Sequence, residues 1–410
     1  MLMRRVAITG LGAVTPLGND VPTFWRALRE GRSGVGPLDR FPIDKLRTDC
    51  AAVVRDFSAD HLLDPKTRDL QGRVTLMLLA SAHEALAQSG LPSEVAERTG
   101  VLLGTGQGSV DVMEENHTKV AARGVRAVSP YFIPSAMPNA ASALLSIERG
   151  FRGPSFTIAS ACATGAHAIA TGALLVASGE ADAMVVGAGE AAILPSCVAG
   201  FGNARALARS YEGDPSRASR PYDVHRNGFV IGEGAAALVL EAEDVAKARG
   251  AEVLAWVAGW GSSSDAEHIA RPHPEGRGLR LAIEQALRRA AIGPDALGYL
   301  NPHATSTPQG DIAEYVALKS ALGPALHDIP ISATKSMIGH LLGGASAAEA
   351  VATVCTLRDG IAHPSINLDE PDPVFELNLL REARRIDARY ALKTSAGFGG
   401  HNCAVVFERA

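Results

Sequence analysis

The sequence predicts an α/β fold in which strands and helices alternate. Short apolar runs bounded by glycine-rich turns are typical of buried strands, and helix-length segments with one apolar face lie between them. Alternation of this kind gives sheets covered by helices. With 410 residues the chain is too long for one ordinary core, and its 47% apolar content is that of a globular protein.

The first half of the chain begins with a buried strand over residues 5–10 and a turn-rich loop from Gly10 onward. The pattern then predicts, in order, a short helix at 24–29, a helix at 74–90 closed by Gly90, a strand at 99–104, a strand at 156–159, a helix at 162–178 and a strand at 183–187.

The second half repeats this order. A strand is predicted at 253–261, a helix at 278–291, a strand at 299–303, a small-residue helix at 339–357, and apolar segments at 391–394 and 403–407 around a glycine-rich loop at 395–401. No low-complexity linker separates the two parts. We therefore expect two related halves, 1–250 and 251–410, that pack as one unit.

Bulk composition excludes several function classes. The net charge of −5 argues against nucleic acid as the main partner. The most apolar runs, such as 181–192, are short and broken by Gly and Glu, so we expect no membrane span, no signal peptide and a cytoplasmic protein. Five cysteines without a Cys-x-x-Cys pair argue against a disulfide framework or a zinc ribbon.

One cysteine stands out from the other four. Cys162 lies where the predicted strand at 156–159 meets the predicted helix at 162–178, among small neighbours that leave room for a substrate. A helix N-terminus favours anions, so we expect a lowered thiol pKa there. The alternative is a buried, inert thiol.

Two histidines lie in segments rich in small and hydroxyl residues. His303 follows a strand and precedes Ala-Thr-Ser-Thr-Pro, which suggests a substrate-facing loop, although a histidine satisfied within a turn fits equally well. His340 is expected at the start of a helix, whose dipole would keep the imidazole neutral and able to donate a hydrogen bond.

Two charged residues accompany His340. Lys335 precedes it by five residues and could be an ordinary surface lysine, whereas Glu349 stands in so apolar a stretch that we expect it to be buried and paired. A zinc site made of Cys162, His303 and His340 is chemically possible, but no pair has the short spacing typical of ligands, so we expect no metal.

Four motifs together resemble those of the β-ketoacyl-carrier-protein synthases of type I/II, over essentially the whole chain. They are Ala-Cys-Ala-Thr-Gly at 161–165, Pro-His-Ala-Thr-Ser-Thr at 302–307, Lys-Ser-Met-Ile-Gly-His at 335–340 and Gly-Phe-Gly-Gly-His-Asn at 397–402. The resemblance implies a thiolase-like fold of layers α-β-α-β-α in two duplicated halves, and an acyltransferase without a cofactor whose substrates are carried on the phosphopantetheine arm of acyl carrier protein.

The resemblance also implies a mechanism. Cys162 takes the acyl group as a thioester, a malonyl carrier loses CO2, and its carbanion attacks that thioester. His303 and His340 stabilise the enolate, and the N–H groups of Cys162 and Phe398 form an oxyanion hole. The remaining implied roles are support of the histidines by Lys335 and Glu349, and substrate binding by Gln107, Phe132, Ile133, Met137, Phe201, Thr305, Thr307 and Gly399.

Gln107 departs from the family pattern, which has an apolar residue at this wall of the acyl pocket. A polar side chain there hints at a polyketide or polyene chain, unless Gln107 turns out of the pocket. The segment at 68–73 lacks the family's usual aromatic residue, and Gly-Ala-Gly-Glu at 187–190 departs mildly from its pattern.

Partner surfaces follow only from the resemblance. Lys66, Arg68, Arg205 and Arg209 map to the family's basic patch for the acidic carrier protein, although they could equally be a solvated face. The segment with Phe132, Ile133 and Met137 would cross a dimer interface and line the partner's pocket, or else simply belong to the core.

Two functions within this chemistry remain open: fatty-acid elongation, and the catalytic subunit of a type II polyketide or polyene synthase paired with a homologous chain-length-factor subunit. A non-catalytic scaffold subunit is disfavoured because Cys162, His303 and His340 are all present. A degradative thiolase needs a second catalytic cysteine, and Cys403 lies outside a suitable motif. A starter-unit synthase has Asn where position 340 is His.

Overall fold

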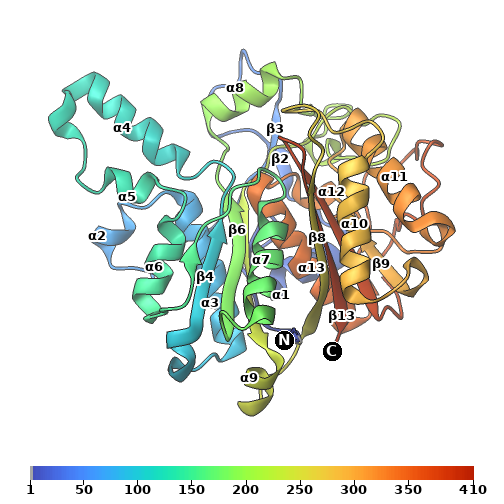
Figure 1. Cartoon of the computed structure of the whole chain (residues 1–410). Helices are drawn as coiled ribbons and strands as arrows, with labels where there is room; N and C mark the ends of the chain where they lie inside the picture. The colour runs from blue at the N-terminus through green and yellow to red at the C-terminus, as the bar shows by residue number, and fades with distance from the viewer. Residues whose placement is uncertain (1–2) are drawn as a thin grey trace.

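The computed structural model describes residues 3–410, so Met1 and Leu2, the start of the predicted N-terminal half, lie outside it. Nine strands form one sheet (Figure 1). In spatial order they are β5 (Ser155–Phe156), β4 (Thr99–Gly104), β6 (Ala183–Glu190), β7 (Gly234–Ala242), β1 (Val6–Val14), β8 (Ala255–Ser264), β13 (His401–Arg409), β12 (Tyr390–Gly397) and β9 (Leu297–Asn301).

The two sides of this sheet have the same strand pattern. On one side β1 pairs with β7 and β7 with β6, both antiparallel, and β6 pairs with β4 in parallel. On the other side β8 pairs with β13 and β13 with β12, both antiparallel, and β12 pairs with β9 in parallel. The antiparallel pair β1–β8 joins them.

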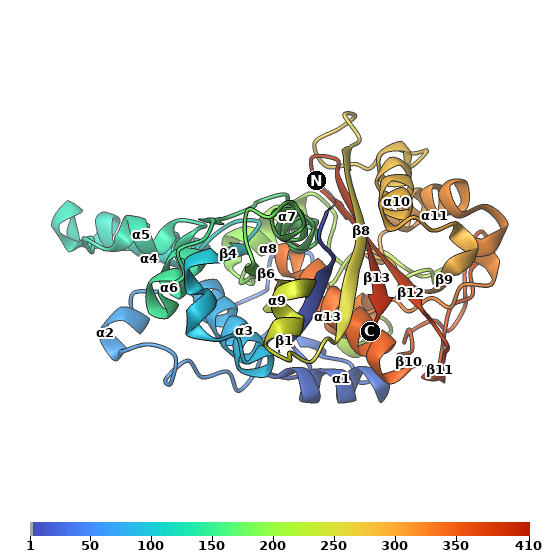
Figure 2. The same cartoon turned by 60° about the horizontal axis from the view of Figure 1, so that its bottom comes forward.

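Four helices complete the layers. Helix α3 (Arg73–Ser89) packs on β1, β7 and β6, and α10 (Arg277–Ala290) packs on β8 and β13. Between the two sides, α7 (Thr164–Ser178) and α13 (Ala345–Asp359) contact each other and the inner faces of the strands (Figure 2). The arrangement is the predicted α-β-α-β-α layering.

The remaining elements lie around these layers. They are α1 (Val21–Arg29), β2 (Val35–Pro37), β3 (Cys50–Ala52), α2 (Pro65–Arg68), α4 (Val110–Arg123), α5 (Phe132–Ala136), α6 (Ala140–Arg149), α8 (Pro195–Asn203), α9 (Glu243–Ala248), α11 (Pro308–Leu322), α12 (Lys335–Ile338), β10 (Ile361–Ala362) and β11 (Arg384–Arg385).

The first strand is longer than predicted because two of its glycines serve packing and not turns. The predicted loop from Gly10 onward is in fact strand as far as Val14. A Cβ atom at Gly10 would lie 2.0 Å from the carbonyl oxygen of Ala85, and one at Gly12 would lie 1.8 Å from that of Ser81. Glycine at both positions therefore lets α3 lie directly against β1.

The predicted helix at 339–357 is wrong in its first part. The chain forms the short helix α12, then passes through His340, which bridges to Ile231, then makes a 3₁₀ turn at Leu342–Gly344, and only then begins α13. Gly339 has φ of +64°, and a Cβ there would meet Ala52 and Val230 at 2.9 Å, so the helix cannot run through this point.

The stretch Ala161–Ser178 is long and apolar enough to be a membrane span by length and composition, contrary to the expectation that no segment is. In the structure 61% of it is buried within the protein. A core helix gives the same signal, and α7 is such a helix.

Candidate active site

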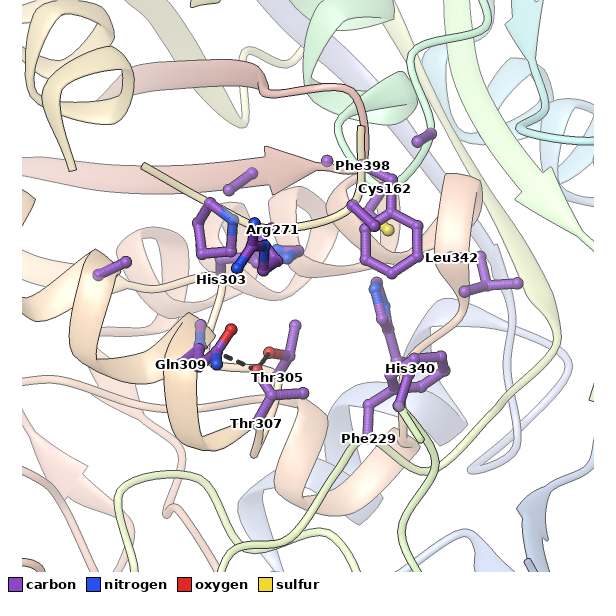
Figure 3. Close-up of a pocket in the computed structure, with 18 of the residues that line it drawn as sticks. Cys162, Phe229, Arg271, His303, Thr305, Thr307, Gln309, His340, Leu342 and Phe398 are labelled. Atoms are coloured by element: carbon purple, nitrogen blue, oxygen red, sulfur yellow. Dashed lines mark hydrogen bonds between the residues drawn. The ribbon is translucent and has the colours of Figure 1, made fainter. Parts of the chain in front are cut away.

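A cavity of about 640 Å³ brings together residues from both halves of the chain. Cys162, His303, His340 and Phe398 all line it, and Figure 3 shows them converging on one space. Each comes from a different segment, at the ends of strands or just before a helix. The three predicted catalytic side chains are therefore close together.

Cys162 sits on a tight turn immediately before α7. Ala161 has φ of +50°, a left-handed conformation that non-glycine residues rarely adopt and that is found at functional sites. The turn after β12 presses against it, since a Cβ at Gly397 would lie 3.1 Å from the backbone nitrogen of Cys162. This close approach places the backbone N–H groups of Phe398 and Cys162 beside the half-buried thiol.

The expectation of a lowered thiol pKa is wrong. Burial raises the pKa of Cys162 to about 11, although the charge of Lys335 and the N–H groups of Phe398 and Cys162 act in the opposite direction. These opposing effects are too weak to offset the loss of water. Cys162 is therefore a thiol at neutral pH, held among donors that favour its anion.

His303 is fixed from behind by charged groups. The backbone N–H groups of His303 and Ala304 both donate to the Glu314 carboxylate at 2.7 Å. In this loop Ala304 and Ser306 have φ of +41° and +67°. The Lys335 ammonium lies 3.4 Å from Nδ1. Because an ammonium only donates, Nδ1 accepts and the proton sits on Nε2.

His340 lies edge-on to His303, with ring centroids 5.4 Å apart, and its other side packs on Phe229 at 5.2 Å. Burial, followed by the charges of Lys335 and Lys393, holds the pKa of His340 well below its usual range, and the same causes act on His303, which also feels His340. Both rings are neutral at physiological pH. The cause is burial and two lysines, not the predicted helix dipole.

Behind the histidines lies a fully buried ionic cluster. Lys335 Nζ lies 2.5 Å from Oε1 of Glu349, and Lys393 Nζ lies 2.9 Å from its Oε2. Glu349 is buried and paired, as predicted. Lys335 is not a surface residue.

The predicted substrate-binding residues divide into two groups. Gln107, Phe201, Thr305 and Thr307 line the cavity together with the catalytic candidates. The hydroxyls of Thr305 and Thr307 are 2.9 Å apart, and Gly399 follows Phe398 in the turn between β12 and β13. The other group consists of Phe132, Ile133 and Met137, which lie on and after α5, outside the cavity lining.

Gln107 is among the residues that line the cavity. Its Oε1 accepts a hydrogen bond from the Cys197 thiol at 3.2 Å, which satisfies part of its polarity. Phe201, from the same α8 helix as Cys197, has its ring centroid 6.2 Å from that of Phe398. One wall of the cavity is therefore polar beside an aromatic pair.

Glu190 holds this wall in place. Its buried carboxylate accepts from Thr105 Oγ1 at 2.8 Å and from the N–H groups of Gly106, Gln107 and Gly343 at 2.9, 3.3 and 3.2 Å. Burial raises the pKa of Glu190 to about 7 against these hydrogen bonds.

The four predicted docking cations occupy two separate places. Lys66 and Arg68 are on α2, where Arg68 is paired with Asp60 and Asp69. Arg205 and Arg209 follow α8, which lies apart from α2 in both views, and Arg205 borders the cavity (Figures 1 and 2). Within one chain they do not form a single patch.

Over residues 3–410, no group of three or more His, Cys, Asp or Glu side chains is placed to hold a metal ion.

Lys393, Glu314 and Glu190 were absent from the predicted site. A lysine between Leu392 and Thr394 in an apolar strand was the available signal for Lys393. Nothing local marks Glu314, because its contacts join α11 to the His303 loop.

Comparison with known proteins agrees with the geometry. The family profile "Beta-ketoacyl synthase, N-terminal domain" matches residues 3–246, and "Beta-ketoacyl synthase, C-terminal domain" matches 254–369. The chain is 43% identical to a Vibrio harveyi protein named 3-oxoacyl-[acyl-carrier-protein] synthase 2, covering 100% of this chain and 99% of the relative. A protein of the same name from Synechocystis is 41% identical, covering 99% and 98%.

Solved structures give the same result. The ishigamide ketosynthase/chain length factor superposes with a TM-score of 0.92 at 30% identity, and a β-ketoacyl synthase from Burkholderia phymatum STM815 with 0.90 at 33% identity, each over 100% of both chains. A type II polyketide synthase acyl-carrier protein in complex with its ketosynthase gives 0.92 at 29% identity over 100% of both chains. By sequence and by fold, the chain belongs to the β-ketoacyl synthase family.

Proposed function

We propose that the chain condenses an acyl group held on Cys162 with the malonyl group of a carrier protein, with loss of CO2, in fatty-acid elongation. The observation that carries this proposal is a half-buried thiol and two neutral imidazoles facing one cavity, with the N–H groups of Phe398 and Cys162 at the thiol. The relatives named 3-oxoacyl-[acyl-carrier-protein] synthase 2, which match this chain over essentially its full length, support the proposal.

In the first step, the sulfur of Cys162 attacks the thioester carbonyl of the acyl carrier. The thiol proton leaves with the departing carrier sulfur, so thiol and thioester exchange without a net proton. The two N–H groups stabilise the oxyanion of the tetrahedral intermediate. Because the pKa of Cys162 is raised to about 11, the sulfur must lose its proton as it attacks.

In the second step, the malonyl carrier loses CO2 and its α-carbon keeps the electron pair as an enolate. His303 donates to the enolate oxygen from Nε2–H, the tautomer that Lys335 enforces, and His340 donates beside it. The carbon then attacks the thioester on Cys162, a C–C bond forms, and the expelled thiolate takes a proton from water. The product is a β-ketoacyl carrier extended by two carbons.

Acyl carrier protein is the proposed substrate carrier. Arg205, at the cavity border, together with Arg209, provides positive charge for an acidic partner, and Thr305 and Thr307 offer hydroxyls to the arm that enters. We propose a cytoplasmic location, in keeping with five cysteines that are all free.

A homologous subunit is the proposed second partner. Ile133 and Met137 are 59% and 42% exposed, Phe156 on β5 is 40% exposed, and β5 is an edge strand with one unpaired side. An apolar face beside a free strand edge is typical of an interface. Figure 1 shows α4 and α5 projecting from the body next to this face.

A second candidate function is the catalytic subunit of a type II polyketide or polyene synthase. The polar Gln107 among the lining residues favours an acyl chain that carries oxygen atoms. The likeness to ketosynthases of such systems supports it. In that case the homologous subunit would be a chain-length factor.

The test is condensation in vitro. Purified protein is incubated with malonyl carrier and with carriers bearing either saturated or polyunsaturated chains, and the carrier product is weighed by mass spectrometry. Elongation of saturated chains supports the fatty-acid role. Elongation restricted to unsaturated chains, or to mixtures with a homologous subunit, supports the second candidate. No β-ketoacyl product from any combination would refute both.

A further inference from the structure

Lys393 is a buried lysine at the back of the site. Its side chain is fully buried, which is rare for lysine and unfavourable unless the charge is paired. It lies on β12, paired in register with Asn301 of β9, two residues before His303. It is also five residues before Phe398 on its own strand.

The ammonium of Lys393 is well satisfied. It lies 2.9 Å from Oε2 of Glu349 and donates to the carbonyl oxygen of Thr394 and to Ser395 Oγ at 3.3 Å. Lys335 occupies the other oxygen of the same carboxylate. Each oxygen of Glu349 therefore serves a different lysine, and each lysine limits where Glu349 can move.

Two ammoniums share the carboxylate of Glu349, and Glu314 is the next carboxylate whose charge acts on Lys393. Glu314 accepts from the backbone N–H groups of His303 and Ala304. Burying two ammoniums and two carboxylates is costly compared with an apolar core. Departures of this kind are expected where function requires them.

The charge of Lys393 acts on both histidines. After burial and Lys335, it lowers the pKa of His303 and of His340, whereas the cation that acts most strongly on Cys162 is Lys335. Its influence therefore falls mainly on the enolate-stabilising pair.

We propose that Lys393 is a second positioning lysine: it holds Glu349 so that Lys335 stays behind His303, and its charge keeps both histidines neutral during decarboxylation. This inference rests on the proposed condensation. A proton on Nδ1 of His303 would point at the Lys335 ammonium. Because both groups would then be donors with no acceptor between them, the ring would be displaced.

The charged and titratable groups around Lys393 all belong to this cluster. They are Lys335 of α12, Glu349 of α13, Glu314 of α11 with Asp311 beyond it, His303, His340 and, on the neighbouring strand, Cys403. Burial and then Lys335 lower the pKa of Lys393, while Glu349 and Glu314 raise it, so falling pH makes it more fully cationic. Removing it must raise the pKa of both histidines.

The experiment compares wild type with Lys393→Met, Lys393→Arg and the exposed control Lys247→Met. Two half-reactions are followed by mass spectrometry over a range of pH: acylation of Cys162 by an acyl carrier, and decarboxylation of malonyl carrier to acetyl carrier. Thermal unfolding of each variant is recorded alongside.

For Lys393→Met we expect decarboxylation to fall by up to ~10²-fold, the loss that follows a misplaced catalytic group. Acylation stays near the wild-type rate, and the acidic limb of the decarboxylation profile moves to higher pH. Lys393→Arg, which keeps the charge, keeps the limb in place, and Lys247→Met matches wild type.

Two results would overturn the inference. One is a Lys393→Met variant with the wild-type decarboxylation rate and pH profile. The other is an equal loss of both half-reactions together with a lower unfolding midpoint, which marks a purely structural lysine. If the wild-type protein does not decarboxylate malonyl carrier, the proposed function is wrong. If the wild-type protein does so and Lys393→Met reacts equally well, only the inference about Lys393 is wrong.

Discussion

Replacing Glu349 by Gln removes the carboxylate that contacts both Lys335 and Lys393. Two buried ammoniums then remain without it. Removing one partner of a buried ion pair costs about 3–5 kcal/mol. For a chain of 410 residues this corresponds to a fall of roughly 4–6 °C in the unfolding midpoint.

The pH dependence identifies the cause of this loss. Burial already lowers the pKa of Lys393, and Glu349 opposes that effect, so the variant lowers it further. Between that lowered value and the usual lysine value, the unfolded chain binds more protons than the folded one, and stability rises with pH. The deficit of Glu349→Gln should therefore shrink as pH is raised above neutral.

Differential scanning calorimetry at several pH values measures both effects. The matched control is Glu376→Gln, which breaks an exposed pair with Lys319 and should leave the midpoint unchanged. A Glu349→Gln variant as stable as wild type, or one whose deficit does not vary with pH, would refute the electrostatic reading of the cluster.

Three further predictions concern the cavity. Alkylation of Cys162 by iodoacetamide should rise roughly tenfold per pH unit from about pH 7 to about pH 10, because its pKa is raised to about 11; a plateau near neutral pH would contradict this. Glu190→Gln turns an acceptor into a donor facing the N–H groups of the 105–107 loop, and should cost about 1–3 kcal/mol by denaturant unfolding, against no change for Glu94→Gln on the surface. Gln107→Ile should shift acyl preference towards saturated chains in the condensation assay, and an unaltered preference would remove Gln107 from the acyl wall.

The fold was predictable because its strands are short apolar runs that repeat in order along the chain. Prediction from sequence failed where a residue type that is typical of one local structure is required by a contact with a distant part of the chain. Gly10 and Gly12 predicted a turn, yet they are strand residues that admit the backbone of α3. Their reason for being glycine lies some seventy residues away, at Ser81 and Ala85.

The site divides in the same way. Cys162, His303 and His340 were found because each stands in a motif whose neighbours serve the same loop. The pKa of Cys162 was not predicted, because burial outweighs the charge of Lys335 and the neighbouring N–H groups. Lys393 was missed because it lies 44 residues from Glu349, and only the packing of β12 on α13 brings them together.

The central claim is that Cys162 carries the acyl chain. Purified protein is incubated with an acyl carrier, and its intact mass and peptide map are recorded beside Cys162→Ala and Cys403→Ala. We predict one acyl group per chain on the peptide containing Cys162, absent from Cys162→Ala and retained in Cys403→Ala. An acyl group on another residue, or none in the wild type, would contradict the account.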